Sequence, residues 1–159
     1  MIGSRATLEA RARTLAGAVL DPELGDVTIG ELGLVRNVHV LDDGCVEVLL
    51  TPTFLGCPAL SLIAGDVERA VKTLDVADVS VRFVATPGWS PAEITDGGRE
   101  KLAKLGIGVA SPEGHVRCPY CGSDKLAAQV PVGSTSCRSV WWCSGCRTVV
   151  DVMRGTADA

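Results

Sequence analysis

Residues 118–146 read CPYCGSDKLAAQVPVGSTSCRSVWWCSGC, and this stretch decides the fold of the C-terminal third of the chain. Two Cys-x-x-Cys turns frame it and supply four candidate metal ligands: Cys118, Cys121, Cys143 and Cys146. Two such turns, brought together by a hairpin, form the tetrahedral sulfur cage that Zn²⁺ prefers. Gly122 and Gly145 stand where the turns need positive φ or a close approach of backbone to sulfur. We therefore expect a structural zinc site in a ribbon over residues 115–154.

Two other interpretations of these cysteines stay open. The first is two disulfides or free core thiols, but regular disulfides belong to short secreted chains. Residues 1–5 lead into a charged segment rather than the apolar core of a signal peptide. The cysteine count of seven is odd, which also disfavours full pairing. The second is iron in a rubredoxin-like site, because thiolate ligands alone do not distinguish Zn from Fe.

Length and composition indicate one ordinary domain with a small appendage. Of the 159 residues, 47% are hydrophobic and only 4% aromatic, which suits an aliphatic core. No apolar run approaches the roughly 20 residues that cross a bilayer, so we expect no membrane association. Reduced cysteines without an export signal indicate the cytoplasm.

The net charge of −4 is unevenly distributed along the chain. Acidic residues outnumber basic ones up to residue 114, and basic residues prevail slightly after it. A mildly basic ribbon is compatible with nucleic acid, but the sequence has no cluster of Lys and Arg for phosphates. We therefore expect no nucleic-acid partner.

Apolar periodicity predicts the order helix, hairpin, helix, strand, helix and ribbon. The expected elements are a helix over residues 4–20, strands over 35–41 and 45–51, a helix from Pro58, a strand over 79–84, and a helix from Ser90 to Leu105. Asp42-Asp43-Gly44 is a strong hairpin signal between the first two strands. Ser90 has the form of a capping box, and Gly106 is placed to end the last helix.

These elements predict an α+β fold, with a small sheet and its packed helices in residues 1–110. A linker that begins near Gly108 leads to the zinc ribbon of residues 115–154. Because the ribbon is too small to hold a core of its own, we expect the metal to supply its folding free energy.

Cys57 is the second candidate site, because it precedes a predicted helix that opens at Pro58. A thiol there would feel the positive end of the helix dipole and free backbone N–H groups, which favour the thiolate. The hydroxyls of Thr51 and Thr53 lie upstream as possible hydrogen-bond partners. The alternative is a buried cysteine that only starts a core helix.

Other polar and thiol residues are more ambiguous. Asp21 and Glu23 flank a proline at a helix end, where they either bind an ion or partner, or simply stop the helix. Cys45 is expected in the core of its strand, and Cys137 is a possible extra thiol between the two Cys-x-x-Cys turns. No local catalytic motif is present, which favours a binding or assembly protein over a stand-alone enzyme.

Several segments together resemble the SufT-like family of small iron–sulfur assembly domains. They are DPE at 21–23, ELGLV at 31–35 and TPTFLGCP at 51–58. Later segments resemble its PaaD (or PaaJ) branch, the small subunit encoded with the phenylacetyl-CoA oxygenase, or epoxidase. They are TPGW at 86–89, GI at 106–107 and GSTSC at 133–137. The resemblance covers residues 5–153.

The resemblance implies an accessory factor that is not catalytic alone and that matures the oxygenase of aerobic phenylacetate breakdown. It implies Cys57 as a ligand of iron or an iron–sulfur cluster, with Asp21, Glu23 and Thr53 around it. It also implies structural zinc on the ribbon cysteines. The implied partners are the oxygenase and reductase subunits, which carry a di-iron centre, flavin and an iron–sulfur cluster.

One thiolate cannot close a cluster cage, which usually takes four ligands. We therefore expect a transient site at Cys57, completed by another subunit or by a second copy in a homodimer. The main alternative is a structural scaffold subunit of the oxygenase complex with no role in metal delivery.

Overall fold

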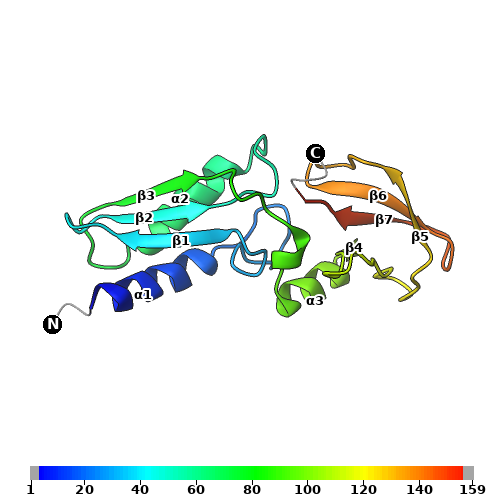
Figure 1. The fold of residues 1–159 in the computed structure, drawn as a ribbon, viewed down its shortest axis with the longest axis horizontal. Coiled ribbons are helices and arrows are strands. Elements are labelled where there is room, and N and C mark those ends of the chain that lie inside the picture. The colour runs from blue at the N-terminus through cyan, green and yellow to red at the C-terminus, as the bar shows by residue number, and fades with distance from the viewer. Residues whose placement is uncertain (1–3, 156–159) are drawn as a thin grey trace.

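Three strands form the first sheet (Figure 1), and the more buried residues alternate along them. The computed structural model describes residues 4–155. In sheet order the strands are β1 (Val35–Val40), β2 (Val46–Leu50) and β3 (Val79–Phe83). The predicted hairpin joins β1 to antiparallel β2, with φ of 82° at Gly44. Because β3 is parallel to β2, the connection between them must cross over the sheet.

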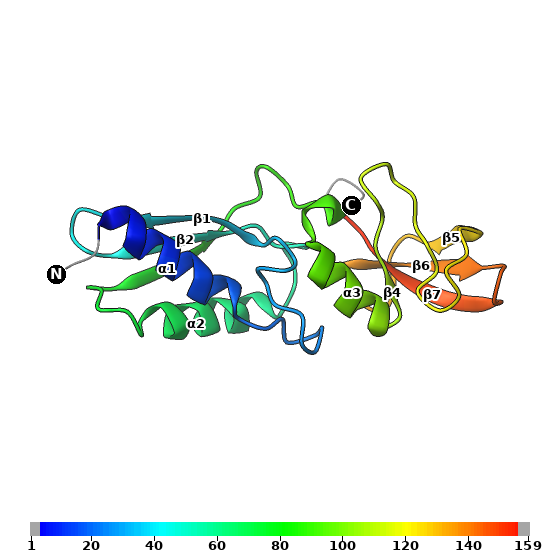
Figure 2. The ribbon, with the colours of Figure 1, turned by 90° about the horizontal axis from the view of Figure 1, so that it is seen from below.

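Two helices pack against this sheet and against each other (Figure 2). They are α1 (Arg5–Gly17), which leads into β1 through a loop, and α2 (Leu60–Val71), which makes the crossover from β2 to β3. Ala12 and Ala16 of α1 are fully buried. The buried residues of α2 recur at four-residue spacing: Ile63, Val67 and Val71. Within residues 4–155, no helix is long and apolar enough to span a membrane.

A second sheet lies beyond the end of the first along the long axis of the molecule (Figure 1). In sheet order its strands are β4 (Ile107–Gly108), β7 (Thr148–Met153), β6 (Arg138–Cys143) and β5 (Leu126–Val130). β4 runs parallel to β7, whereas the other pairs are antiparallel. The expected linker is therefore wrong at its first residue, because Gly108 pairs with Val152 inside the sheet.

The helix expected from Ser90 to Leu105 is broken. Ser90 caps only a short 3₁₀ turn, η1 (Pro91–Glu93), and the chain is extended at Ile94. Thr95 then caps α3 (Asp96–Lys104) by accepting a hydrogen bond from the Gly98 amide at 3.1 Å. Gly106 takes the predicted positive φ, 76°, after the end of α3.

One hydrophobic core joins the two sheets. Ile107 of β4 and Met153 of β7 belong to the same buried cluster as the valines of the first sheet. Trp89 is buried in the same cluster, and its Nε1 donates a hydrogen bond of 2.7 Å to the Leu32 carbonyl. The predicted α+β class is confirmed, and the boundary between residues 1–110 and 115–154 stays a prediction.

We expect Gly33→Ala to destabilise the fold by about 2–4 kcal/mol. Gly33 has φ of 73°, and an added Cβ would lie 2.6 Å from the carbonyl oxygen of Glu93. Gly25 is a matched control, because its φ is 64° but no described atom lies within 4 Å of its added Cβ. Urea unfolding of both variants measures the difference, and equal losses would contradict the proposed steric conflict.

Candidate functional site

Both Cys-x-x-Cys turns lie at one end of the second sheet and bring their sulfurs together. The four ligand atoms lie within 4.8 Å of one another: Sγ of Cys118, Cys121, Cys143 and Cys146. Cys118 and Cys143 are buried, whereas Cys121 and Cys146 are exposed. The Sγ atoms are 3.7 Å apart in both the Cys118–Cys146 pair and the Cys121–Cys143 pair.

These separations fit a four-coordinate metal. A tetrahedron with Zn–S bonds of about 2.3 Å has edges of about 3.8 Å, whereas a disulfide bond is about 2.05 Å long. Hydrogen bonds, chiefly from the backbone N–H of Cys146 and then from the neighbouring thiols, lower the pKa of the Cys143 thiol to about 7, whereas burial and the same thiols raise that of Cys146 to about 12. The residues present therefore fit a zinc ion held by four thiolates.

The glycines of the turns have the conformations that the sequence predicted. Gly122 takes φ of 73°. A Cβ on Gly145 would lie 2.9 Å from the Ser123 side chain and 3.5 Å from Sγ of Cys121. The second turn therefore needs glycine to approach the first.

A second group of site residues lies where the two sheets meet. A small inner cavity of about 20 Å³ has room for one water molecule or ion. All of the predicted assembly residues line it, together with the possible extra thiol: Asp21, Glu23, Thr53, Cys57 and Cys137. A wider outer cavity of about 270 Å³ shares Glu23 and both cysteines with the inner one.

The thiol of Cys57 is not activated as its position before α2 predicted. Partial burial raises its pKa above the ordinary value, and the negative charges of Glu23, Cys137 and Asp21 add to this effect. A backbone N–H at Ala59 opposes the shift without cancelling it. Helix α2 begins only at Leu60, three residues after Cys57. The expected thiolate is therefore wrong for the free protein, because desolvation and like charges outweigh the helix start.

Only one of the two threonines lines the inner cavity together with Cys57. Thr51 is buried and accepts a hydrogen bond of 3.1 Å from Nε of Arg36. That guanidinium also pairs with Glu93 at 3.2 Å. Thr51 therefore helps to fix η1 to the first sheet, whereas Thr53 lines the inner cavity.

Asp21 and Glu23 form a tight acidic turn beside Cys57. Oδ1 of Asp21 accepts a hydrogen bond of 2.8 Å from the backbone N–H of Glu23. Burial raises the pKa of Asp21, and the nearby charge of Glu23 raises it further. Two carboxylates and two thiols thus border one cavity; among the described residues, only the four ribbon cysteines form a group of three or more ligands close enough to share one ion.

The structure shows that Cys45 lies outside the core, contrary to expectation, and that Cys137 lines the cavities around Cys57. Cys45 lies just before β2, is partly exposed and donates its backbone N–H to Asp43 at 3.0 Å, so it is not in the core. Cys137 reaches the Cys57 cavities from the loop before β6. Because Cys57 and Cys137 lie in loops that are far apart in the sequence, only the tertiary fold reveals that they line the same cavities.

We expect Glu23→Gln to make Cys57 more reactive near neutral pH. The Glu23 carboxylate raises the pKa of Cys57, so its neutralisation lowers that pKa and increases the thiolate fraction. The rate of alkylation by iodoacetamide should rise severalfold at pH 8, with the midpoint of the pH–rate profile shifted to lower pH. Mass spectrometry of the Cys57 peptide, sampled over time at several pH values, measures both the alkylation rate and the midpoint of its pH profile.

Asp42→Asn is the control, because Asp42 is an exposed carboxylate paired with Arg5 at 3.0 Å. It should leave the alkylation profile of Cys57 unchanged. A Glu23→Gln profile identical to the parent's would contradict the electrostatic coupling.

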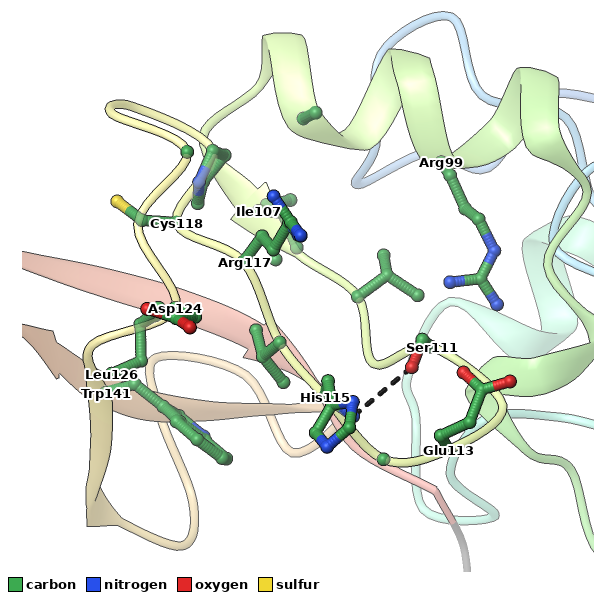
Figure 3. A pocket seen from close by; sticks show the side chains of 17 residues that line it. Arg99, Ile107, Ser111, Glu113, His115, Arg117, Cys118, Asp124, Leu126 and Trp141 are labelled. Atoms are coloured by element: carbon green, nitrogen blue, oxygen red, sulfur yellow. Dashed lines mark hydrogen bonds between the residues drawn. The ribbon is translucent and has the colours of Figure 1, made fainter.

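A larger cavity of about 940 Å³ lies beside α3 and β4 (Figure 3). Arg99 extends into it from α3, but all three of its guanidinium nitrogens donate to backbone carbonyls. The acceptors are Ile94 at 3.2 Å, Ala110 at 2.8 Å and Pro91 at 2.9 Å. Arg99 therefore holds three chain segments together, and its charge is already engaged.

The opposite wall of this cavity is a turn closed by its own polar groups. The backbone N–H of His115 donates to Oγ of Ser111 at 3.3 Å (Figure 3). A hydrogen bond from the Ser111 side chain lowers the pKa of Glu113. These contacts hold the turn itself, so the cavities around Cys57 are the better candidate for chemistry.

Comparison with known families gives two matches within the chain. A family model described as iron–sulfur cluster assembly protein matches residues 9–83. A second model, described as the PaaD zinc beta ribbon domain, matches residues 107–154. The first includes Cys57 and the acidic turn, and the second includes all four clustered cysteines and Cys137.

Individual relatives agree with these matches. A protein of Escherichia coli (strain K12), provisionally named as one of the subunits of 1,2-phenylacetyl-CoA epoxidase, is 34% identical over 149 residues, which is 88% of each chain. The Fe-S protein maturation auxiliary factor YitW of Bacillus subtilis (strain 168) is 35% identical over 64% of this chain and 97% of its own. A crystal structure of the domain of unknown function DUF59 from Bacillus anthracis superposes with a TM-score of 0.58 at 31% identity, covering 62% of this chain and 94% of that one.

Proposed function

Because this chain belongs to the family of iron–sulfur cluster assembly proteins, in the branch with a PaaD-type zinc ribbon, we propose that it is a maturation factor that carries iron or an iron–sulfur cluster at Cys57. The cargo is bound transiently and passed to a client protein. In this proposal the chain itself catalyses no reaction on an organic substrate.

The observation that carries this proposal is the shared lining of the inner cavity. Asp21 and Glu23 come from the loop after α1, Thr53 and Cys57 come from the loop after β2, and all four line this cavity. Their donor atoms suit a cation, and binding of iron would displace the proton from Cys57. A raised pKa fits a carrier, because the protonated thiol binds metal weakly and lets the cargo leave.

We assign the four clustered cysteines to structural zinc: Cys118, Cys121, Cys143 and Cys146. When bound, zinc supplies folding free energy and no redox chemistry. In this proposal the zinc-stabilised ribbon positions the loop that carries Cys137, which lines the cavities around Cys57.

The proposed clients are the oxygenase and reductase components of a phenylacetyl-CoA epoxidase system. The support is the name of the Escherichia coli relative together with the match to a PaaD-type ribbon. An oxygenase with a di-iron centre and a reductase with an iron–sulfur cluster both need iron, which gives a carrier a purpose in such a system.

A scaffold subunit is the second candidate function. Several large apolar side chains of the ribbon are at least a third exposed, as a protein-binding surface requires. They are Tyr120, Trp142 and Val149. In this alternative the ribbon docks on the oxygenase and the thiol of Cys57 has no cargo.

Co-production with the oxygenase and reductase components separates the two candidates. Both components would be purified anaerobically after co-production with the parent chain or with Cys57→Ala, and their iron content measured. The carrier proposal expects a severalfold loss of iron from one component with the variant. Full iron content, with the complex intact, would favour the scaffold instead.

A further inference from the structure

The ribbon contributes one wall of the cavity that holds Cys57. The outer cavity lies between two chain segments that are far apart in sequence. Phe54, Gly56, Cys57 and Pro58, with Glu23, form the wall from the first sheet. The facing wall is the loop that precedes β6, residues 132–137, which we term the ribbon loop. At about 270 Å³ the cavity is smaller than typical organic-ligand pockets and suits an ion or a compact cluster.

Backbone hydrogen bonds hold both cysteines in place. The carbonyl of Cys137 accepts from the backbone N–H of Arg154 at 3.0 Å, beyond the end of β7. Gly133 and Arg138 close the ribbon loop with a bond of 2.7 Å from the Gly133 amide to the Arg138 carbonyl. On the other wall, the Cys57 carbonyl accepts from the Leu60 amide at 3.2 Å. Each thiol therefore projects from an anchored backbone rather than from a free loop.

We propose that Cys137 is a second thiolate ligand for the cargo, so that one chain holds iron between Cys57 and Cys137. This proposal rests on the proposed role of Cys57 as an iron ligand. It gives the ribbon a direct chemical part in the carrier site, besides its structural zinc.

The chemistry of two thiolates fits iron delivered as Fe²⁺. Each thiol loses its proton to solvent on binding, no electron is transferred, and Glu23 lines both cavities together with the two thiols. Two thiolates are also the number that each iron of a Cys₄-ligated [2Fe–2S] cluster takes. A single chain would thus fill one half of such a cluster, and a client or a second copy would fill the other.

The surroundings of the two thiols support this pairing. The charge on Cys137 is one of the causes that raise the pKa of Cys57, as expected for two thiols at one site. Oγ1 of Thr135 lies 3.3 Å from Sγ of Cys137, within hydrogen-bonding distance, so its hydroxyl is placed to donate to the sulfur once a metal displaces the thiol proton. Both cysteines are only partly buried and neither is in a disulfide, so both are available to a metal.

Co²⁺ is the probe, added anaerobically to full-length protein whose ribbon is already loaded with zinc. The parent should bind one further Co²⁺, with sulfur-to-cobalt charge-transfer absorbance, and the ion should protect Cys57 and Cys137 together from iodoacetamide. Cys137→Ser should weaken binding at least tenfold, since even outer-shell partners of metal sites contribute about 10–100-fold. It should also lose about half of the charge-transfer absorbance. Cys45→Ser is the control and should behave as the parent.

The outcomes separate this inference from the function on which it rests. If Cys57→Ser abolishes Co²⁺ binding while Cys137→Ser binds like the parent, Cys137 is not a ligand but the proposed function stands. If neither variant changes Co²⁺ binding, both proposals fail. Zinc content of one per chain and an unchanged circular dichroism spectrum ensure that each variant is folded.

Discussion

Cys57→Ser should reduce the iron bound per chain more than tenfold while leaving the zinc content unchanged. The substitution replaces a thiol that lines both cavities with a hydroxyl of similar size, which is a poor ligand for iron at neutral pH. The fold should survive, because Cys57 is only partly buried and lies outside the clusters of buried core residues. The measurement is iron and zinc per chain after anaerobic reconstitution with Fe²⁺ and sulfide.

Cys45→Ser is the matched control for this prediction. Cys45 is also a partly buried free cysteine of the first sheet, but it lies in the β1–β2 hairpin and lines neither cavity of Cys57. Its iron content should equal that of the parent. Retention of iron by the Cys57 variant would remove the carrier role from this thiol and leave the scaffold as the better account.

Cys143→Ser should release zinc and unfold the ribbon. Cys143 is fully buried, and only four other buried residues share its small cluster: Val116, Cys118, Val150 and Val152. So small a core cannot replace a metal that contributes about 10–16 kcal/mol in zinc-finger peptides. Loss of zinc therefore removes free energy comparable to the roughly 5–15 kcal/mol that stabilises a typical domain.

Unfolding of the ribbon should also destabilise the first sheet. Met153 at the end of β7 and Ile107 in β4 pack in the core of that sheet, so an unfolded ribbon withdraws both. Loss of one such side chain costs about 2–5 kcal/mol. Hydrogen exchange should show complete loss of protection in β5–β7 and weakened protection in β1–β3.

Ser144→Ala controls for a change within the same turn. Oγ of Ser144 is exposed and donates to the Lys125 carbonyl at 3.2 Å. This variant should keep its zinc and lose at most about 1 kcal/mol. If Cys143→Ser keeps zinc and amide protection in β6 and β7, then the metal is not what holds the ribbon.

The sequence predicted those features that depend on neighbouring residues. The hairpin at Gly44, the positive φ at Gly106 and Gly122, and the order of strands and helices all follow from local patterns. The spacing of two Cys-x-x-Cys turns was sufficient to bring four sulfurs within 4.8 Å of one another. Local signals sufficed here because turn chemistry and short spacings fix the geometry before tertiary packing acts.

The errors arose where tertiary packing overrides local preference. Ser90 and Thr95 both offer capping hydroxyls, and the sequence alone does not show that the chain restarts at the second one. The Thr95 amide donates to the Glu31 carbonyl at 2.9 Å, so packing against a distant loop accompanies the break. The pKa of Cys57 was misjudged for a similar reason, because burial and the Glu23 charge come from distant segments.

The facing walls of the outer cavity have a consequence for the order in which the protein is made. Cys57 leaves the ribosome about 80 residues before Cys137, since their positions are 57 and 137. At about 5–20 residues per second this interval is about 4–16 s. During that time the emerging chain has only the wall of the cavity that carries Cys57. The cavity is therefore completed only when almost the whole chain has been synthesised. Until then the chain lacks Cys137, the second proposed ligand, and we expect it to bind iron weakly.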